Sequence, residues 1–344
     1  MLFNRALAKG LPAEWTMHTI VPIHKSGDPL DPSNYRTIMI GHTLAKLYGA
    51  VLEAELSSYV EREGLRAPVP RDRLFQRLLT LGVPSEMLWG IFSLYERVSA
   101  RVRCPGGTSS SLASTIGVKQ GCPLSPTLFG LYIDELSEHI LRDGGGGVDL
   151  ADTPVHIMLY ADDIVLVSES HEGLQRHLWI LDDFCTRRGL TVILGKTKVL
   201  IFHASRQVRS RATFTLAGGR VEVTDSYVYL GTTFTATTRR FSMASAARDR
   251  ITRGYATLAM LERRCHQAHF QEPRTKGCLF DTLVTPALMY AAPVWAPSLT
   301  GSWWTQVERP QIIMLSRLIR GKPSVPHDII RAELATPPML ETGL

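Results

Sequence analysis

The stretch HIMLYADDIVLVSES, His156 to Ser170, sets two adjacent acidic residues between two apolar runs. Before the acids, Val155 begins an alternation of strand-forming and other residues that continues to Tyr160. After them comes the run Ile164–Val167, whose residues are all good strand formers. Such runs predict two strands joined by a tight turn, with Asp162 and Asp163 at its tip.

Asp162 and Asp163 are candidate metal ligands and catalytic residues because their charges need a partner. Two carboxylates about 4 Å apart repel by roughly 4 kcal/mol at an effective dielectric of 20, and a bound divalent cation would turn this repulsion into attraction. Mg²⁺ takes oxygen ligands and accepts phosphate oxygens in the same shell. The alternative is an ordinary hairpin whose turn uses Asp, which turns favour.

A second motif, VKQGCPLSPTLFGLYIDEL at residues 118–136, precedes the hairpin. With YADD it resembles the palm of a reverse transcriptase, and QGCPLSP is similar to the enzymes of non-LTR retrotransposon polyproteins of the LINE or R2 type. Viral RNA polymerases and group II intron maturases share the paired aspartates. The resemblance implies an α+β right-hand polymerase with an antiparallel palm sheet packed on helices and a mostly helical C-terminal region. The implied ranges are a fingers remnant at 1–66, the palm at 69–205, and the primer-grip hairpin with a thumb-like region at 212–344.

The same resemblance implies contacts with an RNA template, a DNA primer and deoxynucleoside triphosphates, and Mg²⁺ or Mn²⁺ as cofactor. Lys25 and Arg36 stand where the fingers address template or triphosphate, although both also fit solvated loop cations. Gln120 and Gly121 would lie against the template and the nucleotide pocket, although glycine and proline there also suit a plain helix start, with Pro123 opening the helix. Lys196, in KTK, would assist the pyrophosphate leaving group. The primer-grip residues would be Tyr229, Leu230 and Gly231.

Composition agrees with a folded protein that has a polyanionic partner. The 344 residues carry a net charge of +6 with a pI near 9.1, which permits nucleic-acid binding without proving it. Five arginines near the C-terminal helices could follow a sugar-phosphate backbone or form a solvated face: Arg248, Arg250, Arg253, Arg263 and Arg264. Five scattered cysteines without a CxxC pair favour a reduced compartment and predict no zinc site. We expect an intracellular location, nuclear by the resemblance, and no membrane partner; the oligomeric state is open.

One expected segment is missing. In the family, a further catalytic aspartate comes from a strand just before wording like VPRDRL, which stands here at Val69–Leu74. Residues 66–68 are Arg, Ala and Pro, so that strand is absent, and we interpret Asp72 as a helix cap. The chain would then be a reverse transcriptase domain truncated at both ends. Two hypotheses follow: an RNA-directed DNA polymerase by descent and fold, or a catalytically defective remnant that binds nucleic acid or a partner. The missing strand favours the second and predicts poor solubility, because it would leave a sheet edge uncovered.

Overall fold

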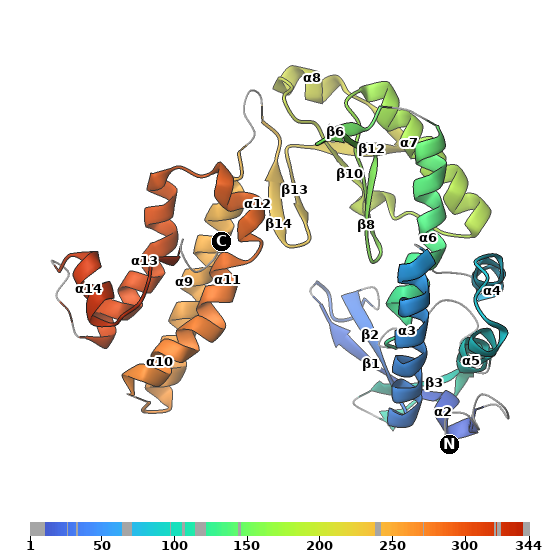
Figure 1. Ribbon diagram of the computed structural model, residues 1–344, viewed down its shortest axis with the longest axis horizontal. Helices are drawn as coiled ribbons and strands as arrows, with labels where there is room; N and C mark the ends of the chain where they lie inside the picture. Colours follow the sequence, from blue (N-terminus) through green and yellow to red (C-terminus); the bar gives the residue numbers. More distant parts are fainter. Residues whose placement is uncertain are drawn as a thin grey trace. The chain divides into compact units, whose positions relative to one another are not determined.

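The protein is a mixed α/β chain with several small sheets, seen in the computed structural model of Figure 1. The structure describes residues 11–25, 27–31, 34–63, 71–96, 98–104, 107–113, 122–143, 146–237, 242–270, 272–319, 321 and 325–339, with α3 side chains described as far as Glu53. The chain forms two compact units, Met1–Ile193 with Thr215–Gly218, and Leu194–Phe214 with Gly219–Leu344. This division does not test the three ranges predicted for fingers, palm and thumb, which stay predictions.

The larger sheet of the first unit is built around β1 (Met17–His24), which follows the short helix α2 (Ala13–Thr16). β1 pairs antiparallel with β2 (Tyr35–Gly41) and parallel with β3 (Ser99–Cys104). β3 in turn pairs antiparallel with β4 (Gly107–Thr108) and β5 (Leu112–Ala113). The β-branched residues after Trp15 predict a strand, and the turn sequence after Arg103 predicts a hairpin; β1 and the pairing of β3 with β4 confirm both.

Five helices complete this unit: α3 (Thr43–Glu63), α4 (Arg71–Thr80), α5 (Ser85–Glu96), α6 (Ser125–Arg142) and α7 (His171–Arg188). α6 packs on α3, α4 and α7. The spacing of its leucines predicts one apolar face, and this is confirmed, since Leu124, Leu128, Leu131 and Leu136 are all fully buried. The alternating acidic and basic residues of α3 predict a solvated face that includes Glu53, but Glu53 accepts a hydrogen bond from the Thr127 hydroxyl (3.2 Å), which links α3 to α6.

The helix ends show where local sequence decides. Ser170 caps α7 by accepting a hydrogen bond from the Gly173 N–H (3.0 Å), and Gly189 ends it at φ +68°, so the predicted glycine cap is confirmed. The expectation for α6 is wrong in one detail. Pro123 precedes the cap residue Leu124, and Pro126 is the proline in the first turn, where a missing N–H costs nothing.

In the second unit, β10 (Lys198–Leu200) pairs parallel with β12 (Gly219–Thr224), and β13 (Ser226–Tyr229) pairs antiparallel with β14 (Thr232–Thr235). β11 (Phe214–Leu216) lies where the chain passes from one unit to the other. The other elements are helical: η2 (Leu194–Lys196), α8 (Arg206–Arg211), α9 (Ala244–Gln267), α10 (Pro273–Leu279), η3 (Phe280–Val284), α11 (Thr285–Met289), α12 (Ala292–Trp295), η4 (Ala296–Ser298), α13 (Gly301–Leu318) and α14 (His327–Glu333). The C-terminal region is thus mostly helical, as predicted.

One core of this unit surrounds Trp295, which is fully buried, with Trp303 and Trp304 packed against it. The tryptophans therefore serve packing, as expected. No single helix in the described ranges is long and apolar enough to cross a membrane. One pair of helical segments reaches that length and apolarity only when joined: Pro273–Met289 and Ala292–Ser298, which are bent by 41° at the break between them. Three residues of this pair, Phe280, Val284 and Leu288, belong to the cores of the unit.

Candidate functional site

The acidic hairpin forms as predicted. β8 (Ile157–Tyr160) pairs antiparallel with β9 (Asp163–Leu166), with Tyr160 opposite Asp163, so Ala161 and Asp162 make a two-residue turn. The predicted first strand was too long. Val155 belongs to a separate hairpin, in which β6 (Val148–Leu150) pairs with β7 (Thr153–Val155). His156 lies between β7 and β8 and belongs to neither strand.

Asp162 and Asp163 are both exposed, as is Tyr160 beside them at 61%. Neither carboxylate has a side-chain hydrogen bond or ion pair within the part of the chain that the structure describes. These two oxygen donors suit one Mg²⁺, which would keep most of its waters with so few protein ligands. In the described ranges, no group of three or more His, Cys, Asp or Glu residues is placed to hold a metal.

The hairpin is supported from behind by α7, which contacts β9. The apolar patterns of both elements also predict that the helix from Leu124 packs beneath the hairpin. The main helical neighbours of α6 are α3, α4 and α7, and its contact with the hairpin stays a prediction. The backbone carbonyl of His156 accepts a hydrogen bond from the Val167 N–H (2.9 Å). The centroid of the His156 ring lies 5.6 Å from that of the fully buried His177 of α7. A Cβ on Gly147 would come within 2.7 Å of the His156 ring. The four consecutive glycines before Val148 predict a flexible connector, but Gly147 is required by packing.

The two predicted fingers cations lie close together. Arg36 stands in β2 opposite Ile23 of β1, and Lys25 follows the end of β1, where its N–H donates to the Asn34 carbonyl (2.8 Å). Both side chains are exposed.

Gln120 and Gly121 lie outside the described residues. Asp72 is the second residue of α4, not its cap, so our interpretation of Asp72 was wrong in position; a carboxylate in the first turn still suits the helix dipole.

Lys196 and the Tyr229–Gly231 turn both belong to the second unit. Lys196 ends η2 with its side chain exposed, and its carbonyl accepts a hydrogen bond from the Tyr227 hydroxyl (3.3 Å). Tyr227 thus links the KTK segment to β13, a role the sequence did not signal. The turn itself is tight, because Tyr229 pairs with Thr232, and Leu230 (φ +45°) and Gly231 (φ +75°) are both left-handed.

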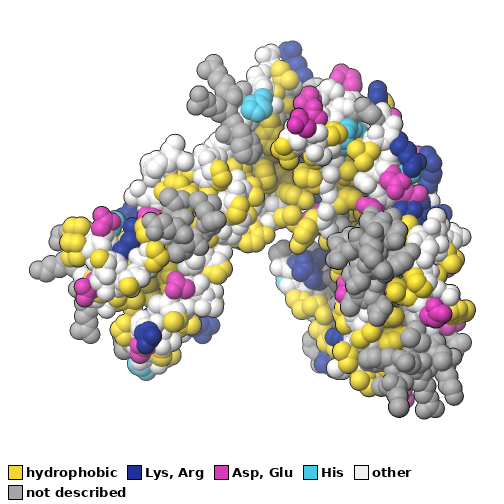
Figure 2. All heavy atoms as spheres, in the orientation of Figure 1, with side chains coloured by type: hydrophobic (Ala, Val, Ile, Leu, Met, Phe, Trp, Pro, Cys, Tyr) yellow, Lys and Arg dark blue, Asp and Glu magenta, His cyan; other side chains and the backbone are white. Residues whose placement is uncertain are grey.

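The five arginines divide into two kinds. Arg248, Arg253, Arg263 and Arg264 are exposed on α9, whereas Arg250 is buried. Burial, with some help from the neighbouring charge of Arg253, lowers the pKa of Arg250, although a guanidinium stays charged at neutral pH. On the face drawn in Figure 2, Lys and Arg side chains gather in separate groups.

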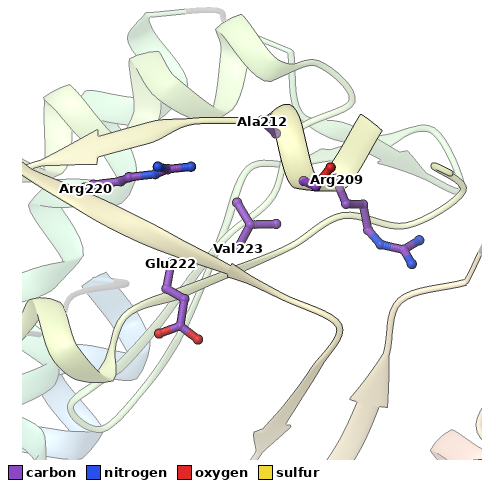
Figure 3. Close-up of a pocket in the computed structure, with 6 residues that line it drawn as sticks. Arg209, Ala212, Arg220, Glu222 and Val223 are labelled. Carbon is purple, nitrogen blue, oxygen red and sulfur yellow. The ribbon is translucent and has the colours of Figure 1, made fainter. Parts of the chain in front are cut away.

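A pocket of about 300 Å³ lies between α8 and β12, lined by Arg209, Ser210, Ala212, Arg220, Glu222 and Val223 (Figure 3). Its buried cation is already used, since Arg209 is paired with Asp225 (3.0 Å) and donates to the Ala204 carbonyl. Glu222 is paired with Lys198 (2.6 Å). None of the predicted site residues lines this pocket.

Comparison with known proteins gives a consistent result. Residues 67–234 match the family described as reverse transcriptase (RNA-dependent DNA polymerase). The chain is 24% identical to a Pol polyprotein of the R2 retrotransposable element of Popillia japonica, over 81% of this chain and 44% of that protein. It is 32% identical to the R2DM polyprotein of Drosophila melanogaster over 48% of this chain and 16% of that protein. It is also 26% identical to the RNA-directed DNA polymerase of the mobile element jockey of Drosophila funebris, over 60% of this chain and 22% of that protein. The chain therefore spans less than half the length of these relatives.

Proposed function

We propose, from the premise that residues 67–234 are a reverse transcriptase domain of the non-LTR retrotransposon type, that this chain binds an RNA template with its DNA primer but does not extend the primer. The observation that carries the proposal is the exposed pair Asp162 and Asp163 at a hairpin tip that has no third acid beside it in the described ranges. In this proposal, α6 and the β8–β9 hairpin belong to the palm and α9 begins the thumb.

Binding is supported by the charges that face solvent. A reverse transcriptase domain implies nucleic-acid substrates, and the chain carries a net charge of +6. Lys25 and Arg36 lie together at one end of the β1–β2 pair, and four exposed arginines follow α9. Each cation that neutralises a phosphate releases a counterion, so affinity should fall steeply with salt.

The proposed defect rests on counting ligands. Nucleotide addition uses two divalent ions about 3.5–4 Å apart, which stabilise the attacking and leaving oxygens. Two neighbouring carboxylates cannot fix both ions. The segment between α3 and α4, GLRAPVP at residues 64–70, contains no acidic residue. Positioning accounts for ~7–11 kcal/mol of barrier lowering in well-aligned reactions, and without it Asp162 and Asp163 would bind a weak, mobile ion.

A primer-extension assay with Mg²⁺ or Mn²⁺, a template–primer and deoxynucleoside triphosphates tests the catalytic part. We expect no extension above background from the unaltered chain, and recovery in a version that carries a relative's segment inserted before Val69. The matched substitutions are Asp162→Ala and Asp149→Ala, the latter an exposed acid of the neighbouring hairpin. Extension by the unaltered chain that Asp162→Ala abolishes and Asp149→Ala preserves would support the second candidate, an active polymerase.

The binding part is tested separately by titrating the folded chain with template–primer at several salt concentrations. We expect the logarithm of affinity to fall linearly with the logarithm of salt concentration. Absence of binding even at low salt would contradict the proposal. A nuclear location belongs to the same proposal, and fluorescence microscopy of the tagged chain tests it.

A further inference from the structure

The turn at Leu230 and Gly231 is one that its own sequence does not favour. A two-residue hairpin turn with both φ angles positive prefers Asn or Gly at its first position. Leu230 holds that position at φ +45°, where the Cβ of a bulky residue crowds the following carbonyl. Contacts from elsewhere in the fold must therefore stabilise this conformation.

Two side chains from the helical region supply those contacts. The Tyr290 hydroxyl donates to the Leu230 carbonyl oxygen (2.8 Å), and the Arg250 guanidinium donates to the Gly231 carbonyl oxygen. Both carbonyls of the turn thus have a donor, one neutral and one charged. Hydrogen bonds from charged donors are about twice as strong as neutral ones, so Arg250 should hold the turn more firmly.

Arg250 and Tyr290 also contact each other. The guanidinium carbon lies 5.0 Å from the centroid of the Tyr290 ring, within range of a cation–π contact, and Arg250 is only 5% exposed. Its charge is therefore directed at a carbonyl and a ring. This separates Arg250 from the exposed Arg253, Arg263 and Arg264, which remain available to phosphates. Arg248 is also exposed, but its guanidinium carbon lies 5.7 Å from the centroid of the Trp303 ring.

The pair is itself held in place. Trp295, which is fully buried, donates from its indole nitrogen to the Tyr290 carbonyl (2.9 Å). Two further contacts fix β14 along α9. The Thr233 hydroxyl donates to Asp249, and the hydroxyls of Thr235 and Ser245 lie 2.7 Å apart. The hairpin is therefore docked on α9 at its turn and at two points along one strand.

We propose that Arg250 and Tyr290 are positioning residues that fix the Leu230–Gly231 turn against α9, and that without them the turn loses the primer-end contact that the family resemblance implies for it. The second half rests on the proposed function. Since both turn carbonyls are occupied from the α9 side, the turn can present only one surface to a ligand. A loose turn would bind a primer end and an uninterrupted strand equally.

The first measurement is hydrogen exchange of residues 226–235 in the full chain without nucleic acid. Arg250→Met removes the charged donor. Tyr290→Phe removes only a hydroxyl and keeps the ring packing, so this variant still tests the proposal if Arg250→Met does not fold. We expect exchange on the order of tenfold faster for Arg250→Met and several-fold faster for Tyr290→Phe. Arg253→Met, an exposed arginine three residues along the same helix, should leave these amides unchanged. Unchanged exchange in Tyr290→Phe and in any folded Arg250→Met would overturn the positioning role.

The second measurement compares affinity for a template with a recessed primer end and for an uninterrupted duplex of equal length. Tyr290→Phe and Arg250→Met should lower the preference for the recessed end by several-fold and leave affinity for the duplex unchanged. Arg253→Met should weaken both equally. Preference retained in both positioning variants would overturn the role toward the primer. If the unaltered chain binds neither nucleic acid, the proposed function and the role toward the primer both fail, while the exchange result still decides whether Arg250 and Tyr290 fix the turn.

Discussion

Two hairpins in this protein each turn through two residues and have different means of support. β8–β9 turns through Ala161 and Asp162, and β13–β14 turns through Leu230 and Gly231, each with two residues at the tip. The first tip has exposed carboxylates without a side-chain partner in the described ranges, and α7 packs behind its second strand. The second tip has both carbonyls bound by Arg250 and Tyr290.

This difference separates what each hairpin can do. An open tip with two acids leaves its oxygens available to a cation but does not hold them in one arrangement. A tip bound on one side is held in one arrangement and has fewer free groups. The comparison predicts that the second hairpin depends on the core of its unit, whereas the first depends on its own sequence.

The largest expected effect comes from Trp295→Ala. Removing this fully buried side chain should lower the free energy of unfolding of the second unit by about 3–5 kcal/mol, because it leaves a cavity and an unpaired Tyr290 carbonyl. Denaturant unfolding measures the loss, and hydrogen exchange should show faster amides in β13–β14 but not in β8–β9. The control is Trp179→Ala on α7, 60% exposed, with less than about 0.5 kcal/mol expected. Equal effects from the two variants would contradict the comparison.

A smaller loss is expected from Gly231→Ala. Alanine at φ +75° is strained, and its Cβ would lie 3.4 Å from the Tyr290 ring, so the free energy of unfolding should fall by about 1–2 kcal/mol. Gly277→Ala in α10, where the added Cβ meets nothing within 4 Å, should instead stabilise by up to about 1 kcal/mol through helix propensity. Thermal unfolding of both variants would show shifts of opposite sign; a gain from Gly231→Ala would sink this prediction.

The first hairpin should respond in the opposite direction. Ala161 sits at φ +50°, so Ala161→Gly should stabilise the first unit by about 0.5–1 kcal/mol. The matched change Ala50→Gly, inside α3, should destabilise by about 1 kcal/mol. Chemical unfolding measures both. A loss in Ala161→Gly would mean that this tip also depends on tertiary contacts.

The smallest effect concerns pH and the helix behind the first hairpin. Burial, helped by Asp182, raises the pKa of Cys185 on α7 to about 11. Because the folded value lies above the unfolded one, its contribution to stability is present below about pH 9 and is lost as pH rises toward 11. The urea midpoint should therefore fall less between pH 8 and 10.5 in Cys185→Ala than in the unaltered chain. Cys278→Ala, at an exposed site, should match the unaltered chain, and identical slopes in all three would refute the assignment.

Local patterns predicted much of this fold. The leucine stripe of α6, the Gly189 cap of α7 and the Ala161–Asp162 turn followed from local patterns. The Leu230–Gly231 turn was expected only from the resemblance. The errors came from features without a local period. His156 lies outside both neighbouring strands and its ring contacts that of His177 on α7, and Glu53 accepts a hydrogen bond from a hydroxyl on another helix. Residues Gln120 and Gly121 lie outside the described part, so their roles stay predictions.

The sequence by itself determined that the β8–β9 hairpin forms and carries paired acids, because strand alternation and turn residues act over a few neighbouring positions. The β13–β14 hairpin was expected from the family resemblance. Only the tertiary structure decided which hairpin is held. Arg250 reaches the turn from 19 residues away and Tyr290 from 60, distances at which no repeating pattern marks a contact. Arg250 therefore looked like the four exposed arginines around it in sequence. Burial against Tyr290 gives it a different partner, because a buried guanidinium must find acceptors inside the protein.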